Sequence, residues 1–389
     1  MEYSICRIGD LCKKVCSGGT PTSSNSNYYD GGIPWLNTNE VNFCNIYSTN
    51  RTISEEGLNH SAAKYIPINS VIVAMYGVTA GKSAIAKIPL TTNQACCNLI
   101  IDESKANYQF VYYFLKLQSD NLNKLANGGA QQNLNSLLIK KYKIALPDLP
   151  TQRRIASILS AYDNLIENNN RRIRLLEQMA ENLYKEWFVR FRFPGHEKVE
   201  MENGLPKGWR YAKLEDVLSL KDSTRIPLSS IERSNMQKIY PYYGAASILD
   251  YVSDYLFDGV YLLLGEDGSV IDENGYPYIQ YVWGKFWVNN HAHVIEKKGV
   301  YSVEFLYCMF KKMNIQSIVT GVAQPKISQG RLFNKKVIIP CDSIISLFDK
   351  QIQPIFAEIR QLTNQITNLT RQRDLLLPRL MSGKLEVNA

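Results

Sequence analysis

Residues 155–187 decide the fold of this chain and read IASILSAYDNLIENNNRRIRLLEQMAENLYKEW. Their apolar positions step by four and then by three residues, which is the heptad pattern of a coiled-coil helix. The predicted seam consists of Ile155, Leu159, Tyr162, Ile166, Asn169, Ile173, Leu176, Ala180, Leu183 and Trp187. A helix with one long apolar stripe needs a partner along that stripe.

A second copy of this seam follows at a constant offset of 193 residues. Its positions are Phe348, Ile352, Ile355, Ile359, Leu362, Ile366, Leu369, Arg373, Leu376 and Leu380. We expect the two helices to pair antiparallel as a coiled coil; the alternative is that each packs on its own domain. Asn169 stands where the second copy has Leu362, so it is either a register-fixing residue or a solvated one.

Two local signals bound these helices. Thr151 follows two prolines and is predicted to be the N-cap of the first helix. Pro354 is expected to split or kink the second helix, because proline removes a helical hydrogen bond.

The duplication extends beyond the helices. A strand-like run that ends on proline precedes each helix, at residues 142–147 and 335–340, and Ala130–Leu134 matches Ala323–Ile327 at the same offset. A duplicated chain can form a pseudo-two-fold molecule. We predict an α+β fold with two globular domains and two long helices, with these bounds: 1–150, helix 151–193, linker 194–208, 209–341 and helix 342–389.

Local patterns place elements inside the globular parts. Residues 70–76 form an apolar, β-branched run that predicts a buried strand, and residues 260–264 are its expected counterpart in the second half. Residues 107–122 are predicted to be one helix.

Composition limits the class of protein. The 389 residues include 44 basic and 36 acidic side chains, for a net charge of +8. This mild excess permits nucleic-acid binding without establishing it. The eight cysteines contain no CxxC pair, which favours free thiols in a reducing cytoplasm. No apolar run reaches membrane-spanning length and no signal peptide is evident, so we expect a cytoplasmic protein without a membrane partner.

The segment Gly77–Ser83 follows a strand and is close to a phosphate-binding loop. It has three residues between its glycines, where the phosphate-loop pattern requires four. We therefore expect no nucleotide hydrolysis. The loop either presents Thr79, Lys82 and Ser83 to DNA or is a plain surface turn.

Two histidines, His291 and His293, are two residues apart and would share a face on a strand. A metal site would need Glu296 or Asp267 as a further ligand, and no Cys/His cluster supports it. Hydrogen-bonding or packing histidines fit better.

An acidic loop, Glu266–Gly268, could accept hydrogen bonds from cytosine amino groups or form a turn. The chain has no cofactor fingerprint and no methyltransferase, nuclease or nucleophile-elbow motif. These patterns favour a binding protein over a catalyst.

Several segments together resemble type I restriction-modification specificity subunits. Residues 151–163, 176–180, 187–188 and 193–194 are similar to the central helical region of that family, and residues 373–383 to its C-terminal one. Residues 33–36, 81–82 and 321–327 resemble its two target-recognition domains.

The resemblance implies a non-catalytic DNA reader. Each recognition domain would read one half of a bipartite site in double-stranded DNA, and the helices would set the spacing and dock two methyltransferase subunits for adenine-N6 methylation. Restriction (motor-nuclease) subunits would join them. This chain would bind no cofactor or metal; S-adenosylmethionine, ATP and Mg would be held by the partners.

Polar residues in loops are the expected DNA contacts, because they match base edges and phosphates. The candidates are Asn37, Thr38, Asn39, Tyr76, Thr79, Lys82, Asn93 and Gln94 in the first half, and Tyr243, Glu266, Asp267, Asn290, His291 and Lys326 in the second. Two other classes remain open: an interaction protein that does not contact DNA, and an enzyme with an unrecognised site.

Overall fold

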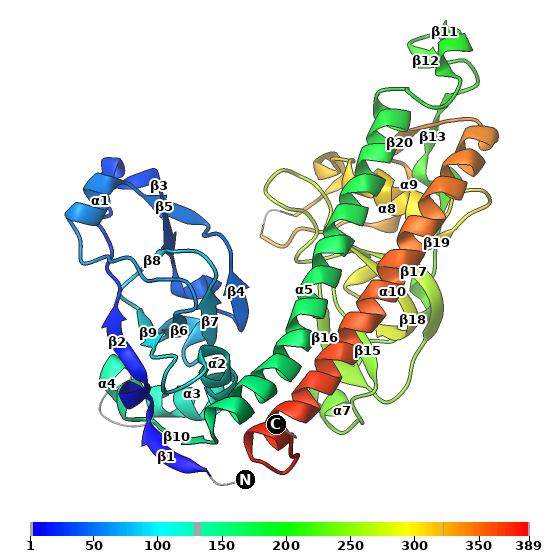
Figure 1. Ribbon diagram of the computed structural model, residues 1–389. Coiled ribbons are helices and arrows are strands. Elements are labelled where there is room, and N and C mark those ends of the chain that lie inside the picture. The colour runs from blue at the N-terminus through cyan, green and yellow to red at the C-terminus, as the bar shows by residue number, and fades with distance from the viewer. Residues whose placement is uncertain (1–2, 128–133, 322, 388–389) are drawn as a thin grey trace. The chain divides into compact units, whose positions relative to one another are not determined.

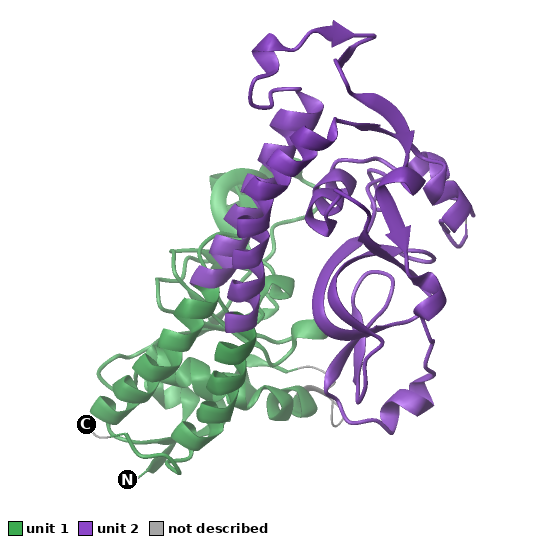
Figure 2. Cartoon of the chain, turned by 90° about the vertical axis from the view of Figure 1, so that its right-hand side faces the viewer, with its two compact units in different colours: residues 1–167, 366–389 green, residues 168–365 purple. Residues whose placement is uncertain are grey.

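The computed structural model describes residues 3–127, 134–321 and 323–387. It divides into two compact units, residues 1–167 with 366–389 (unit 1) and residues 168–365 (unit 2), which Figure 2 colours separately. Each unit contains a globular part and one stretch of each long helix (Figure 2). Residues 130–133 of the predicted repeat lie outside the described residues.

The two long helices are present. Helix α5 spans Leu149–Tyr184, and α10 spans Asp342–Met381 (Figure 1). All twenty predicted seam positions are buried or half-buried, which confirms the heptad pattern. The N-cap prediction was wrong, because α5 begins before Thr151 and the Asp148 side chain accepts a hydrogen bond from the Thr151 amide at 2.9 Å.

Contacts inside each unit pair the helices antiparallel. In unit 1, Arg373 donates to Asp163 at 2.6 Å. In unit 2, the Asn169 side chain donates to Gln365 at 3.2 Å. Asn169 is therefore a buried, hydrogen-bonded seam residue. Both packing modes considered for the helices occur, because each helix also joins the cores of the globular parts.

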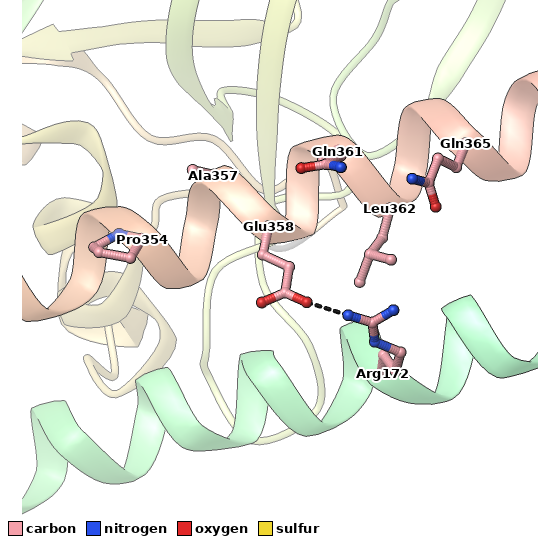
Figure 3. Close-up of a pocket in the computed structure, with 7 residues that line it drawn as sticks. All are labelled: Arg172, Pro354, Ala357, Glu358, Gln361, Leu362 and Gln365. Carbon is pink, nitrogen blue, oxygen red and sulfur yellow. Dashed lines mark hydrogen bonds and ion pairs between the residues drawn. The ribbon is translucent and has the colours of Figure 1, made fainter.

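Helix α10 continues through Pro354, so the predicted split is absent. The missing amide lies on an exposed turn, where a lost helical hydrogen bond costs least. Figure 3 shows Pro354 beside a pocket that also includes Arg172 and Glu358, which form an ion pair between α5 and α10.

Unit 1 is built on a five-stranded sheet in the order β2-β9-β6-β7-β4. The strands are β2 (Cys12–Ser17), β4 (Cys44–Ile46), β6 (Val71–Ala74), β7 (Ser83–Ala86) and β9 (Cys96–Ile101). A three-stranded sheet, β5-β3-β8, and an antiparallel pair, β1-β10, complete the unit. Their strands are β1 (Ser4–Arg7), β3 (Tyr29–Leu36), β5 (Arg51–Ile53), β8 (Thr91–Thr92) and β10 (Lys143–Leu146).

The central strand of unit 1 is shorter than predicted, and the predicted helix is divided. Strand β6 covers four residues of the 70–76 run, and all four are buried. The segment 107–122 forms two helices, because α2 ends before Gln118 and α3 begins after it. The short helices of unit 1 are α1 (Glu55–Asn59), α2 (Tyr108–Leu117), α3 (Ser119–Asn127) and α4 (Ser136–Lys141).

Unit 2 has a six-stranded sheet in the order β14-β19-β17-β18-β15-β16. The strands are β14 (Leu218–Leu220), β15 (Tyr240–Tyr243), β16 (Ile248–Val252), β17 (Phe257–Gly265), β18 (Ile279–Val288) and β19 (Ala292–Lys297). Two smaller pairs are β11 (Met201–Glu202) with β12 (Leu205–Pro206) and β13 (Arg210–Lys213) with β20 (Lys336–Ile339). The short helices are α6 (Leu214–Val217), α7 (Ser230–Ser234), α8 (Val303–Lys311) and α9 (Gln329–Phe333).

Each unit has its own hydrophobic core. In unit 1, Ile155 and Leu159 of α5 and Leu380 of α10 are buried with α2 and the five-stranded sheet. In unit 2, Trp187 and Phe348 are buried with α8 and the six-stranded sheet. These apolar contacts fix the ends of the long helices to the globular parts.

Candidate nucleic-acid interface

Loops at the ends of β3, β6 and β8 meet in unit 1. The Thr79 hydroxyl donates to the Thr38 carbonyl at 2.7 Å, and the Asn93 amide donates to the Asn37 side chain at 3.3 Å. The structure thus brings together loops that are far apart in the sequence. We call the predicted residues on them the first loop cluster: Asn37, Thr38, Asn39, Tyr76, Thr79, Lys82, Asn93 and Gln94.

Members of the first loop cluster differ in accessibility. Asn39, Tyr76 and Gln94 are exposed, whereas Thr79 is buried and its hydroxyl is engaged by the backbone. Lys82 is half-buried and its ammonium donates to Asn42 at 2.8 Å. The exposed side chains and Lys82 can reach an external partner, while Thr79 holds two loops together.

The glycine-rich segment is a turn. Residues Gly77–Thr79 form a 3₁₀ turn, η4, and Gly81 has a φ of +83°. A Cβ on Gly81 would lie 2.8 Å from the Ser119 carbonyl oxygen, so only glycine fits there. Val78 is 96% exposed at the tip of this turn. It was not among the predicted contacts, because these were chosen for their polar side chains.

A second group of loops meets in unit 2 at the ends of β17 and β19. The Glu266 amide donates to the His291 carbonyl at 2.8 Å, and the Ile327 amide donates to the Glu266 carbonyl at 2.8 Å. We call the predicted residues on these loops the second loop cluster: Glu266, Asp267, Asn290, His291 and Lys326. His291 and Lys326 expose about half of their side chains, and His291 pairs with Asp267.

The predicted shared face of the two histidines is not formed. His293 lies in β19 with a fully buried side chain, whereas His291 precedes the strand and is exposed. The two-residue alternation of a strand does not extend into the loop before it.

Tyr243 is separate from the second loop cluster. Its ring packs edge-on against Phe286 at 5.7 Å, and burial raises the pKa of its hydroxyl to about 12. Its carbonyl accepts a hydrogen bond from the Asn289 amide at 3.1 Å, beside the loop that carries Asn290 and His291.

A charged cluster lies beneath the second loop cluster. Of its residues, only Glu266 is among the predicted DNA contacts. We call it the buried hub: Asp222, Arg225, Glu266 and His293. The guanidinium of Arg225 lies 2.7 Å from Glu266 and 3.4 Å from Asp222. No local pattern marks Asp222 or Arg225 in the sequence, because the fold alone brings them to the two strand ends.

Both nitrogens of the His293 ring face hydrogen-bond acceptors. Its Nε2 lies 2.9 Å from the Ile327 carbonyl, which can only accept, and its Nδ1 lies 2.6 Å from an Asp222 carboxylate oxygen. Burial raises the pKa of Asp222, but the hydrogen bond and charge of His293 and the charge of Arg225 lower it more. Asp222 is therefore ionised, and both imidazole nitrogens donate.

Asp222, Glu266 and His293 also form a potential metal-ligand trio, with ligand atoms within 4.8 Å of one another. The donor set does not fit a divalent ion, because both His293 nitrogens already donate and Arg225 neutralises the carboxylates. The cluster joins two carboxylates, a guanidinium and an imidazole, and the Lys326 ammonium lies 3.8 Å from Glu266 at its edge.

The sequence profile described as the type I restriction modification DNA specificity domain matches residues 1–178 and 206–376. The chain belongs to this family. One match falls in each half of the chain, in agreement with the internal duplication.

Specificity subunits resemble the chain over most of its length. The MjaIX type I restriction enzyme specificity subunit of Methanocaldococcus jannaschii is 28% identical, with 99% of this chain and 94% of that protein covered. The EcoprrI specificity subunit of Escherichia coli is 23% identical, with 91% and 87% covered. The chain is thus a type I restriction-modification specificity subunit.

A solved structure shows the same fold. The type I restriction-modification S subunit from M. genitalium superposes with a TM-score of 0.63 at 18% identity, covering 98% of this chain and 96% of that one. Among the described residues of this family member, no helix has the length and apolarity to cross a membrane.

Proposed function

We propose that this specificity subunit reads a bipartite DNA sequence, with one half-site assigned to each unit. The observation that supports this most directly is that the two halves of the internal duplication carry different sets of loop side chains. In unit 1, Met75 follows the central strand, whereas in unit 2 the acidic Glu266 follows it. Two dissimilar readers on one frame suit a site with two dissimilar halves.

Exposed polar side chains supply the recognition chemistry in this proposal. Asn39 and Gln94 in the first loop cluster, and His291 in the second, offer hydrogen-bond groups for base edges. Lys82 and Lys326 are suited to phosphates, where binding depends on salt. Glu266 acts from below the surface, because Arg225 holds its carboxylate.

The long helices are assigned two roles. They set the distance between the half-sites, and their repeated surfaces dock two methyltransferase subunits. Those partners hold S-adenosylmethionine and methylate adenine, and restriction subunits with ATP and Mg complete the nuclease. This chain is proposed to be non-catalytic, in keeping with relatives that are named as specificity subunits.

The decisive experiment compares methylomes of cells with and without this chain. We expect one bipartite methylated adenine motif to disappear on deletion and to return on complementation. An unchanged methylome would refute the proposal. The purified chain, mixed with DNA and methyl donor but without its partner, should transfer no methyl groups.

A further inference from the structure

We propose that Asp222, Arg225 and His293 are positioning residues that hold the recognition loops of unit 2, so that one half-site is read through a buried ionic hub. This inference rests on the proposed function. Three loops carry the second loop cluster, and each is tied to the buried hub by a hydrogen bond.

Arg225 ties the first two of these loops together. Its guanidinium donates to the Glu266 carboxylate at 2.7 Å and to the Ala292 carbonyl at 2.6 Å. Glu266 adjoins Asp267, and Ala292 adjoins His291. The Arg225 side chain thus sets the separation of two candidate readers, of which His291 is exposed and Asp267 is half-buried.

His293 and Asp222 hold the third loop. The His293 Nε2 donates to the Ile327 carbonyl at 2.9 Å, and the Gln329 amide donates to Asp222 at 2.7 Å. The two bonds are made by Ile327 and Gln329, which follow Lys326 in the chain. The Lys326 side chain is more than half exposed. The residue that follows it, Ile327, is held by the hub.

Three of the four hub positions have uncharged counterparts in unit 1. Ala74 pairs with Cys96 as Gly265 pairs with Ala292, so Met75 corresponds to Glu266 and Cys97 to His293. Ser17 pairs with Cys97 and takes the place of Asp222. The hub therefore belongs to one reader and not to the shared frame.

The charges explain why the hub is sensitive to single changes. Arg225 compensates the largely buried carboxylates of Asp222 and Glu266, and an uncompensated buried charge is strongly unfavourable. Asp222→Asn keeps the shape but removes the carboxylate that lies nearest to the His293 Nδ1. Arg225→Lys keeps the charge but cannot contact both loops through one nitrogen and Asp222 through the other two, as the guanidinium does.

The test uses the chain assembled with its methyltransferase partner and duplexes altered base by base in one half-site or the other. We expect D222N and R225K to lower discrimination by about tenfold in one half-site, the same half for both variants. Discrimination in the other half should stay within twofold of wild type. The control is K221A, since Lys221 adjoins Asp222 but pairs with Glu296 outside the hub.

Hydrogen exchange of the β17 and β19 amides separates loosened loops from an unfolded unit. If D222N loses that protection, the discrimination measured with R225K is used to test the proposal. Unchanged discrimination, or equal loss in both halves with β17 and β19 still protected, would overturn the hub proposal. A wild-type complex that binds all sequences equally would instead overturn the proposed function.

Discussion

At the scale of single residues, buried charge is the main consequence of the fold for stability. Asp222 is nearly inaccessible and has two cationic neighbours and a backbone donor, the Val294 amide at 2.8 Å. Removing one member of such a set leaves the remaining charges without compensation.

We expect Asp222→Ala to lower the unfolding free energy of unit 2 by about 3 kcal/mol at pH 7. The pKa of Asp222 lies below its ordinary 3.8 in the folded chain. The stability that ionised Asp222 contributes is therefore complete above pH 3.8. It is lost as the pH falls through the lower pKa of the folded state. Denaturant unfolding should show a difference in unfolding free energy between wild type and variant that disappears in acid. A difference that does not depend on pH would contradict this.

Exposed lysines should act through phosphates. Lys326→Ala and Lys82→Ala are each expected to weaken binding to all sequences alike and to reduce the slope of log affinity against log salt by about one. Fluorescence anisotropy at several salt concentrations measures the slope. Lys198→Ala, in the predicted linker, is the control, and a change of base preference in the lysine variants would argue against phosphate contact.

At the scale of elements, the helix pair explains a charged seam residue. Arg373 occupies a seam position, yet it is largely buried against Asp163, which also accepts a hydrogen bond from the Tyr113 hydroxyl at 2.7 Å. Burial lowers the pKa of Arg373, but Asp163 and Asp374 together raise it more, so the guanidinium remains charged.

Arg373→Ala should destabilise unit 1 by about 3 kcal/mol, because Asp163 would lose its counter-charge. Asp163→Ala should cost a similar amount. The double variant is expected to cost clearly less than the two single changes together, as a coupled pair requires. Thermal or denaturant unfolding of all four proteins measures the coupling, and strict additivity would exclude it.

Helix length should set the unread gap between half-sites. Seven residues inserted after Glu167 and seven before Ile366 keep the heptad frame and add about 10 Å to each helix. We expect the spacer in the methylated motif to lengthen by about three base pairs. An insertion in one helix only makes the two helices unequal in length, so that their seams no longer match, and should abolish specific methylation. An unchanged spacer in the double insertion would refute the role.

At the scale of the whole molecule, the division into two units with separate cores makes the readers exchangeable. Replacing residues 209–341 by the matching segment of a related specificity subunit should alter one half of the methylated motif and preserve the other. Methylome sequencing is the measurement. Changes in both halves would show that the units do not read independently.

Much of this organisation was predictable from periodicity. The heptad seams and the duplication follow from residue order, because a long apolar stripe must be covered whatever the rest of the chain does. Boundaries were less predictable: α5 began earlier than Thr151 indicated, and Pro354 did not end α10. Helix ends depend on competing local hydrogen bonds that a pattern does not rank.

The candidate site was predictable only in part. Loop residues such as Asn37 and Asn93 were found because polar side chains at strand ends are a local feature, and the fold did bring them together. Exposure was not predictable: Thr79 and most of Glu266 are covered, whereas Val78 is open to solvent.

Residue order alone was sufficient to establish the duplicated frame, the paired helices and the family to which the chain is similar. The folded chain was needed to reveal that Asp222, Arg225 and His293 form one charge-balanced set with Glu266 in unit 2 alone. Periodicity is a local property, written in neighbouring residues. A balance of buried charges is a property of side chains up to 71 positions apart that only strand pairing brings within hydrogen-bond distance.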